Sequence, residues 1–101
     1  MNDRISIAKK FAETINTDKI EKIILFGSVA RGDDNENSDI DLLIISNDIF
    51  EIQDKIDSEV LNFVLETDEF ISAHLMTNNM YETRKNYPFL TNVLKEGINI
   101  G

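Results

Sequence analysis

Two short apolar segments constrain the fold of this chain most strongly. The first, Lys22–Phe26, is apolar and β-branched and is closed at once by Gly27, a pattern typical of a buried strand that runs into a turn. The second, Asp39–Ile45, follows a polar loop rich in turn-forming residues at 32–38. The apolar stretches in both are far too short to cross a bilayer. The sequence therefore predicts two adjacent strands joined by a short connection.

Segments with helical periodicity flank these strands. Apolar residues recur at helical spacing through residues 5–15, and Asn2 or Asp3 is available as the N-cap. A second helix is predicted after Asp48, where Glu51 completes a capping-box pattern. The apolar face of this second helix carries Ile49, Ile52, Ile56, Val60 and Phe63. Both helices are expected to pack on the sheet.

The C-terminal third supplies a further strand and two helices. Phe70–Met76 is predicted as the third strand, and Pro88 separates a helix near 81–85 from a last one at 90–96. Gly97 followed by Ile98 suggests a Schellman-type stop for that last helix. These elements predict an α/β (α+β) fold, with a small mixed sheet of three to four strands and helices packed on it. With 101 residues, 42% of them hydrophobic, a single domain over 1–101 is expected.

Charge and cysteine content exclude several classes of function. Nineteen acidic residues against ten basic ones give a net charge of -9, which argues against direct nucleic-acid binding and against an anionic membrane as partner. The chain has no cysteine, so disulfides, thiolate zinc sites and cysteine nucleophiles are excluded. With no signal-peptide pattern at the first residues, a cytoplasmic protein is expected. Most of the acidic residues are expected to lie on solvated helix faces.

Asp39 and Asp41 form the strongest candidate for a metal site. The two-residue period of a strand places both carboxylates on one face, while Ile40, Leu42 and Ile44 point to the other. Carboxylates held this close repel each other unless a cation or a proton lies between them. Oxygen ligands at such spacing favour Mg²⁺, which takes its remaining ligands from water and substrate phosphates. A solvated strand edge is the ordinary alternative.

The segment 27–32 is a candidate phosphate-binding turn. Gly27 permits close approach of the backbone to a ligand, and Ser28 adds a hydroxyl at the start of a short helix whose free amides favour anions. Arg31 and Gly32 are expected to end that helix. The pattern GxxxxGK[ST] is absent, so P-loop ATPase chemistry is not supported. A plain Gly-Ser turn is the alternative.

Taken together, these two segments resemble a known family. Gly27-Ser28-x-Ala30-Arg31-Gly32 followed by Ser38-Asp39-x-Asp41-Leu42 closely resembles the signature of the minimal nucleotidyltransferases (MNT) of the polymerase beta superfamily. The likeness covers roughly a quarter of the chain. The C-terminal segment 89–98 is similar to the ending of many small prokaryotic members. The resemblance implies the palm-like nucleotidyltransferase fold.

The resemblance also implies an activity and its residues. In such proteins an acceptor hydroxyl attacks the α-phosphorus of a nucleoside triphosphate, expected here to be ATP, and pyrophosphate leaves. Asp39 and Asp41 would be the catalytic ligands of one or two Mg²⁺ ions. Gly27, Ser28, Arg31 and Ser38 would bind the nucleotide. The chain would thus be an adenylyltransferase-type nucleotidyltransferase.

Small members of this family resemble the antitoxin half of HEPN/MNT toxin–antitoxin pairs. There the acceptor is a tyrosine of the companion HEPN ribonuclease, and the chain's acidity suits a basic companion protein. A HEPN-type protein is therefore the expected partner, and a homo-oligomer stays open. Two alternatives are a module that neutralises or scaffolds a HEPN partner by contact alone, and a sensor that binds nucleoside triphosphate without transfer.

One departure from the family pattern favours these alternatives. Active members commonly carry a third carboxylate on the next strand, but the corresponding face of Phe70–Met76 offers Ser72 and His74. Asp68 and Glu69 precede the strand and would reach the site only if the strand were placed differently. His74 could serve as a substitute ligand or base, or be an ordinary strand residue. Phe89 is interpreted as packing in the core or at an interface.

Overall fold

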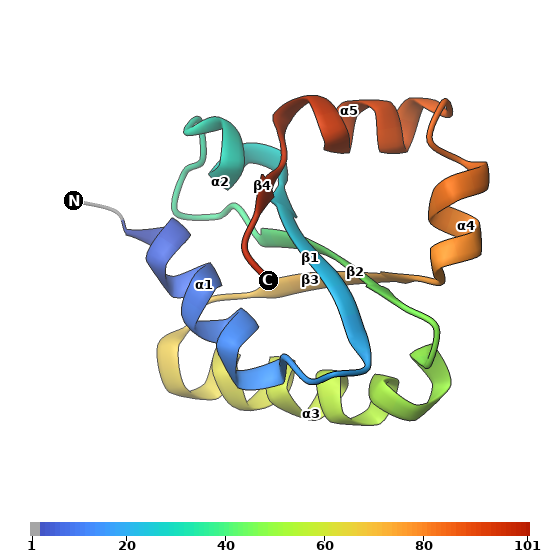
Figure 1. The fold of residues 1–101 in the computed structure, drawn as a ribbon. Coiled ribbons are helices and arrows are strands. Elements are labelled where there is room, and N and C mark those ends of the chain that lie inside the picture. Colours follow the sequence, from blue (N-terminus) through green and yellow to red (C-terminus); the bar gives the residue numbers. More distant parts are fainter. Residues whose placement is uncertain (1–2) are drawn as a thin grey trace.

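The computed structural model describes residues 3–101 and contains a mixed sheet with helices on both faces (Figure 1). The helices are α1 (Arg4–Ile15), α2 (Gly27–Arg31), α3 (Ile49–Thr67), α4 (Asn78–Thr83) and α5 (Pro88–Glu96). The strands are β1 (Ile20–Phe26), β2 (Ile40–Ser46), β3 (Ile71–Met76) and β4 (Ile98–Asn99). The predicted class is confirmed, and the short strand β4 is the element that the sequence pattern did not single out. No helix in the described range is long and apolar enough to cross a membrane.

The sheet has the strand order β3-β2-β1-β4. Strand β1 pairs antiparallel with β2 and with β4, whereas β2 and β3 run parallel, as a connection through the long helix α3 requires. In this register Phe26 lies opposite Asp41, and Asp41 lies opposite Ser72. The end of β1, the start of β2 and the start of β3 therefore meet at one edge.

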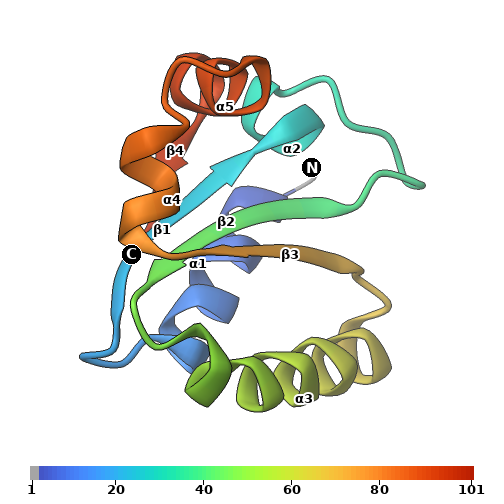
Figure 2. The same cartoon turned by 90° about the vertical axis from the view of Figure 1, so that its right-hand side faces the viewer.

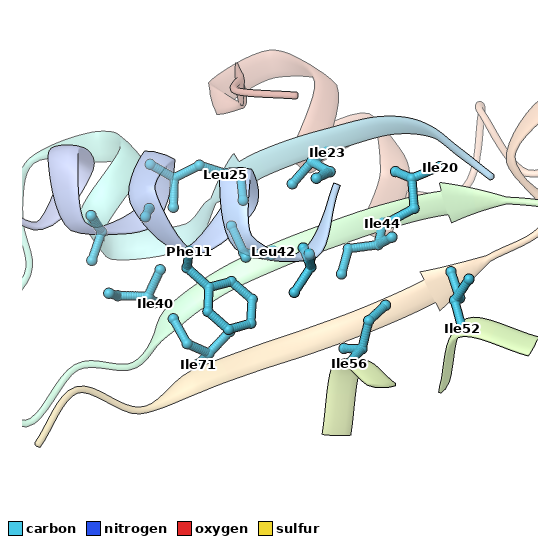
Figure 3. Packing of buried hydrophobic residues seen from close by; sticks show 14 residues of the cluster. Phe11, Ile20, Ile23, Leu25, Ile40, Leu42, Ile44, Ile52, Ile56 and Ile71 are labelled. Atoms are coloured by element: carbon cyan, nitrogen blue, oxygen red, sulfur yellow. The ribbon is translucent and has the colours of Figure 1, made fainter. Parts of the chain in front are cut away.

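One hydrophobic core lies on each face of the sheet. Helices α1 and α3 cover one face, and α4 and α5 cover the other, as the view in Figure 2 shows. The α1/α3 core is the larger, and Figure 3 shows its side chains interleaved between helices and strands. The alternation predicted for β2 is confirmed, because Ile40, Leu42 and Ile44 belong to this core. Leu43 and Ile45 belong to the α4/α5 core, so Asp41 shares their side of the sheet.

Asp3 and Asp48 occupy the N-cap positions of α1 and α3, as predicted, but neither makes a side-chain cap hydrogen bond. The alternative cap of α1, Asn2, lies outside the described residues. The capping box predicted for Asp48 and Glu51 is absent, and the Glu51 carboxylate pairs with Lys19. The backbone amide of Asp48 donates to the hydroxyl of the buried Ser46, so a strand residue fixes this turn.

The Schellman stop at Gly97 is also wrong. Gly97 has φ -71° and ψ 151°, an extended conformation that leads straight into β4. A Cβ atom at this position would collide with the carbonyl oxygen of Val93 and lie 2.6 Å from Cγ2 of Ile24. Glycine is required here because α5 passes close to β1, and the left-handed backbone of the predicted motif is not used.

A buried arginine ties α1 to the loop that precedes β2. The Arg4 guanidinium lies 3.2 Å from a carboxylate oxygen of Asp34 and 3.0 Å from one of Glu69. It also donates to the carbonyl oxygens of Asn35 and Glu36, at 2.8 and 3.4 Å. Buried charges are tolerated when they are paired and hydrogen-bonded, as this one is. The network fixes the loop that delivers Asp39 to the edge of the sheet.

Candidate active site

The site is built around the contact between Gly27 and Asp41. Gly27 follows the last residue of β1 and has φ +78°, a left-handed conformation that L side chains rarely adopt. A Cβ atom on Gly27 would collide with the Asp41 carboxylate, which lies directly against the turn. The backbone of the turn and the carboxylate can approach each other because residue 27 has no side chain.

The turn itself is the short helix α2, which ends as predicted at Arg31 and Gly32. The Ser28 carbonyl oxygen accepts hydrogen bonds from the amides of Gly32 and Asp33, at 2.9 and 3.0 Å. Gly32 has φ +82° and closes the helix in the left-handed conformation. The half-buried Ser28 hydroxyl has no hydrogen-bond partner among residues 3–101, so it is available to a ligand.

Asp39 and Asp41 lie within electrostatic range of each other. Burial raises the pKa of Asp41 above its ordinary value, and the charges of Asp39 and Glu96 raise this pKa further. His74 and Arg31 act in the opposite direction and lower the pKa of Asp41. Neither carboxylate makes a hydrogen bond or ion pair within the described part of the chain. The negative charge of the pair is therefore not compensated by a directly bound protein cation.

The donor set fits a divalent cation that also binds a ligand from solution. In the range 3–101, no group of three or more His, Cys, Asp and Glu side chains is arranged to hold a metal ion by itself. Asp39 and Asp41 would supply two carboxylates, and phosphate oxygens and water would complete the coordination. Mg²⁺ characteristically binds through one or two carboxylates in this way.

Arg31 extends the site towards α5, which lies beside α2 in Figures 1 and 2. Its guanidinium donates to Asp33 at 3.1 Å and to Glu96 at 2.7 Å. Together with Asn92 and Lys95, Arg31 and Glu96 line an open hollow of about 460 Å³. Two cationic side chains, a carboxylate and an amide thus border the space at the end of α2. Sequence reasoning did not identify Glu96, because residues far apart in the chain meet here.

Ser38 has a structural role in the loop before β2. Its hydroxyl accepts a hydrogen bond from the Asn35 amide at 3.1 Å, and its own amide donates to the Asn35 carbonyl oxygen at 3.0 Å. These bonds close the loop immediately before Asp39. The predicted contact of Ser38 with a nucleotide stays a prediction.

The third strand places Ser72 and His74 beside Asp41, as the alternation along it predicts. Ser72 is the parallel partner of Asp41, and the Ser72 hydroxyl lies 3.4 Å from Nε2 of His74. The acids before the strand lie elsewhere. Glu69 pairs with Arg4 of α1, across the sheet from α5, and Asp68 ends α3 with φ +62°. Neither replaces the carboxylate that is missing from β3.

Three aromatic rings meet next to the carboxylates. The Phe26 ring centroid lies 5.5 Å from those of His74 and Phe89, and the His74 and Phe89 centroids are 5.8 Å apart. Phe26 is buried, but Phe89 is 42% exposed and His74 is also exposed. Of the two predicted roles for Phe89, packing in the core or at an interface, the exposure excludes complete burial in the core. One-dimensional periodicity cannot reveal this cluster, because its rings come from β1, β3 and α5.

Comparisons with known proteins agree with this architecture. The sequence matches the family described as "Polymerase beta, Nucleotidyltransferase" over residues 9–101. A protein of Methanocaldococcus jannaschii, named as a candidate protein adenylyltransferase, is 36% identical over 100 residues. That alignment covers 96% of this chain and 96% of the relative.

Two toxin–antitoxin crystal structures contain chains of similar fold. A chain of a mutant MntA–HpeT complex superposes with a TM-score of 0.61 at 19% identity, covering 100% of this chain and 73% of that chain. A chain in the complex of the tri-AMPylated Shewanella oneidensis HEPN toxin with its MNT antitoxin gives a TM-score of 0.56 at 15% identity. Here 95% of this chain and 71% of the other are covered. With the match over residues 9–101 and the archaeal relative, this chain belongs to the polymerase beta nucleotidyltransferase family.

Proposed function

We propose that this chain transfers AMP from ATP to a hydroxyl group of a partner protein. The observation that carries the proposal is the contact between the Asp41 carboxylate and the Gly27 turn, with Asp39 in electrostatic range. This arrangement brings an anion-binding turn and a cation-binding pair to one point. A nucleoside triphosphate complexed with a divalent cation presents the charges that both require.

Each residue then has a defined task. The backbone at Gly27 and the unpaired Ser28 hydroxyl bind phosphate oxygens, and Arg31 lies close enough to Asp41 for its positive charge to act there. Asp39 and Asp41 would hold Mg²⁺. When bound, the cation would neutralise charge that develops on the phosphate oxygens. The protein contributes position and electrostatics, which dominate phosphoryl-transfer chemistry.

The proposed reaction is a substitution at the α-phosphorus of ATP. The acceptor oxygen forms a bond to the α-phosphorus, and the bond from this phosphorus to the bridging oxygen of the β-phosphate breaks. The products are the AMP ester of the acceptor, pyrophosphate and the proton of the hydroxyl group. Because the site opens at the edge of the sheet, a hydroxyl on a folded partner can reach it.

A HEPN-type protein is the partner that we propose. The archaeal relative is named for protein adenylylation, and the Shewanella structure pairs an AMPylated HEPN toxin with an MNT antitoxin. The net charge of -9 favours a basic companion surface. In this role the chain acts as an antitoxin in the cytoplasm by modifying its partner.

The composition of β3 supports a second candidate, binding of the HEPN partner without transfer. Ser72 and His74 stand where a carboxylate would complete the metal site, and residues 3–101 provide no third acidic ligand. Two carboxylates suffice for binding a cation–nucleotide complex. The step that requires a proton acceptor would then be slow or absent.

Labelled ATP distinguishes these candidates. We would incubate the purified chain with Mg²⁺, a co-expressed HEPN-type protein and ATP labelled at either the α- or the γ-phosphate. Transfer of AMP predicts label on the partner from α-labelled ATP alone, since the γ-phosphate leaves with pyrophosphate. Asp41→Asn should abolish labelling, whereas Asp54→Asn, on the exposed surface of α3, should not.

Other results would select another function. A stable complex that never becomes labelled would support the binding module and contradict transfer. Label retained by Asp41→Asn would contradict the assignment of the carboxylate pair. Label from γ-labelled ATP would show transfer of a phosphoryl group in place of AMP.

A further inference from the structure

The exposed aromatic rings beside the carboxylates have no structural task that accounts for their position. Phe26 fills the α4/α5 core, but Phe89 and His74 lie outside that core with much of their surface in solvent. Phe26 and Phe89 meet edge to face, with an interplanar angle of 89°. The exposed rings thus rest on a buried one, which holds them in place without covering them.

One face of helix α5 carries side chains of different character at its two ends. Phe89, Asn92 and Glu96 follow the i, i+3, i+7 spacing of one helical face. Phe89 contacts the aromatic rings, whereas Asn92 and Glu96 line the hollow next to Arg31. At a rise of about 1.5 Å per residue, these ends are about 10 Å apart along the helix. One face of α5 therefore runs from an aromatic end to a charged end, where Glu96 pairs with Arg31 and Lys95 lines the same hollow.

A nucleoside triphosphate also has an aromatic end and a charged end. Its base is flat and aromatic, and its triphosphate is an anion that is attracted by Arg31 and Lys95. Placing the phosphates at the Gly27 turn and Asp41, where the charge of Arg31 also acts, directs the base towards Phe89 and His74. The reverse orientation would put a triphosphate on two phenyl rings and a base between salt-bridged side chains.

We propose that Phe89 and His74, supported by Phe26, form the subsite that stacks the purine base of the nucleotide. The inference rests on the proposed function, since it assumes that this site binds ATP. Base–aromatic stacking is tolerant of sequence but stronger for the larger purine surface. The subsite therefore makes this chain a purine-preferring enzyme. The acceptor side chain, in contrast, arrives on a partner protein that supplies its own contacts.

Binding measurements with and without a base test the subsite. We would titrate the Mg²⁺ complexes of AMP-PNP and of inorganic tripolyphosphate into wild type, Phe89→Ala and His74→Ala by calorimetry. Both variants should weaken AMP-PNP binding, Phe89→Ala by roughly tenfold or more, the size expected of one lost stacking contact. Tripolyphosphate has no base, so Phe89→Ala should leave its affinity unchanged, whereas His74→Ala also removes a charge that acts on Asp41 and is compared only with Phe89→Ala. Leu94→Ala is the matched control, because Leu94 on α5 is 44% exposed and is not part of the cluster.

A tryptophan placed at the subsite gives an independent signal. The chain contains no tryptophan, so Phe89→Trp creates a single tryptophan whose emission can be excited apart from that of the two tyrosines. AMP-PNP should change its emission saturably, whereas tripolyphosphate should not, and the affinity for AMP-PNP should stay near the wild-type value. Restored affinity in Phe89→Trp would separate stacking from a mere loss of packing.

The outcomes separate this inference from the proposed function. Equal affinity of wild type and Phe89→Ala for AMP-PNP would overturn the subsite and leave the assignment of the nucleotide site intact. Equal loss of AMP-PNP and tripolyphosphate would also overturn it, because the ring would then act through the fold. Wild-type protein that binds neither ligand would overturn the proposed function, and the subsite with it.

Discussion

At the scale of single residues, two glycines with the same backbone conformation differ in what surrounds them. Gly27 has φ +78° and Gly32 has φ +82°. A Cβ atom on Gly27 would meet the Asp41 carboxylate, whereas one on Gly32 would have nothing within 4 Å. Substituting each glycine therefore distinguishes the free-energy cost of a left-handed backbone, which both share, from the need for space beside Asp41, which only Gly27 meets.

Gly27→Ala and Gly32→Ala should each lower the free energy of unfolding by about 1–2 kcal/mol, because both place a side chain in the left-handed region. Only Gly27→Ala should also abolish Mg²⁺-dependent nucleotide binding, since its methyl group displaces Asp41. Urea denaturation and calorimetry measure the two effects. Full nucleotide affinity in folded Gly27→Ala would show that the contact is not needed for binding.

The raised pKa of Asp41 predicts how stability depends on pH. Burial raises this pKa in the folded state, with Asp39 and Glu96 adding to the effect. The folded protein thus binds more protons than the unfolded chain between the two pKa values, so this carboxylate lowers stability as pH rises through that range. Asp41→Asn should be more stable than wild type at pH 7, and the difference should shrink as the pH approaches 4. A difference that grows on acidification would contradict this sign.

The residues of the site were predictable where their spacing fixes the geometry. The glycine after β1 marks the turn that contacts Asp41, whereas β2 begins at Ile40, one residue after Asp39, so the shared strand face of Asp39 and Asp41 stays a prediction. Spacing could not show that Phe89 faces His74 or that Glu96 pairs with Arg31, because these contacts depend on where α5 packs.

At the scale of elements, β4 and the end of α5 depend on Gly97. Residues Ile98 and Asn99 pair with Leu25 and Ile24 at the edge of the sheet. Gly97→Ala should lower the free energy of unfolding by about 1–3 kcal/mol, the usual cost of overpacking, although φ -71° suits alanine. Denaturant unfolding tests this. An unchanged midpoint would mean that the segment 97–99 shifts freely away from β1.

The Arg4 network joins α1 to the loop 32–38 and to the turn before β3. Arg4→Ala would leave the carboxylates of Asp34 and Glu69 without this cation, and loss of one partner of a buried ion pair costs about 3–5 kcal/mol. Lys19→Ala removes an exposed pair with Glu51 and is the control, with little expected change. Urea denaturation compares the two, and similar small losses would show that the buried network does not stabilise the loop.

The existence and type of the long elements could be predicted because their periodicity is strong. The contacts at the helix ends could not be predicted, because tertiary contacts replace local cap motifs there. The amide of Asp48 bonds to Ser46, and Glu51 pairs with Lys19. Gly97 is extended because α5 lies close to β1. Strand β4 has two residues, too few for any periodic signal.

At the scale of the whole molecule, the net charge of -9 shapes the choice of partner. An acidic surface accelerates and strengthens association with a basic protein, and salt screens this attraction. The association rate with a HEPN-type partner should therefore fall steeply as NaCl rises from low to physiological concentration, while the dissociation rate changes less. Stopped-flow or surface-based kinetics measures both rates, and an association rate independent of salt would contradict charge-guided binding.

The account depends on the joint binding of a divalent cation and a nucleotide by Asp39, Asp41 and the Gly27 turn. Calorimetric titration of AMP-PNP with and without Mg²⁺, into wild type, Asp39→Asn and Asp41→Asn, tests this most directly. We predict that the wild type binds AMP-PNP tightly only when Mg²⁺ is present. Both variants should lose this Mg²⁺-dependent binding while their circular dichroism spectra stay native. Equal Mg²⁺-dependent affinity in all three proteins would contradict the assignment.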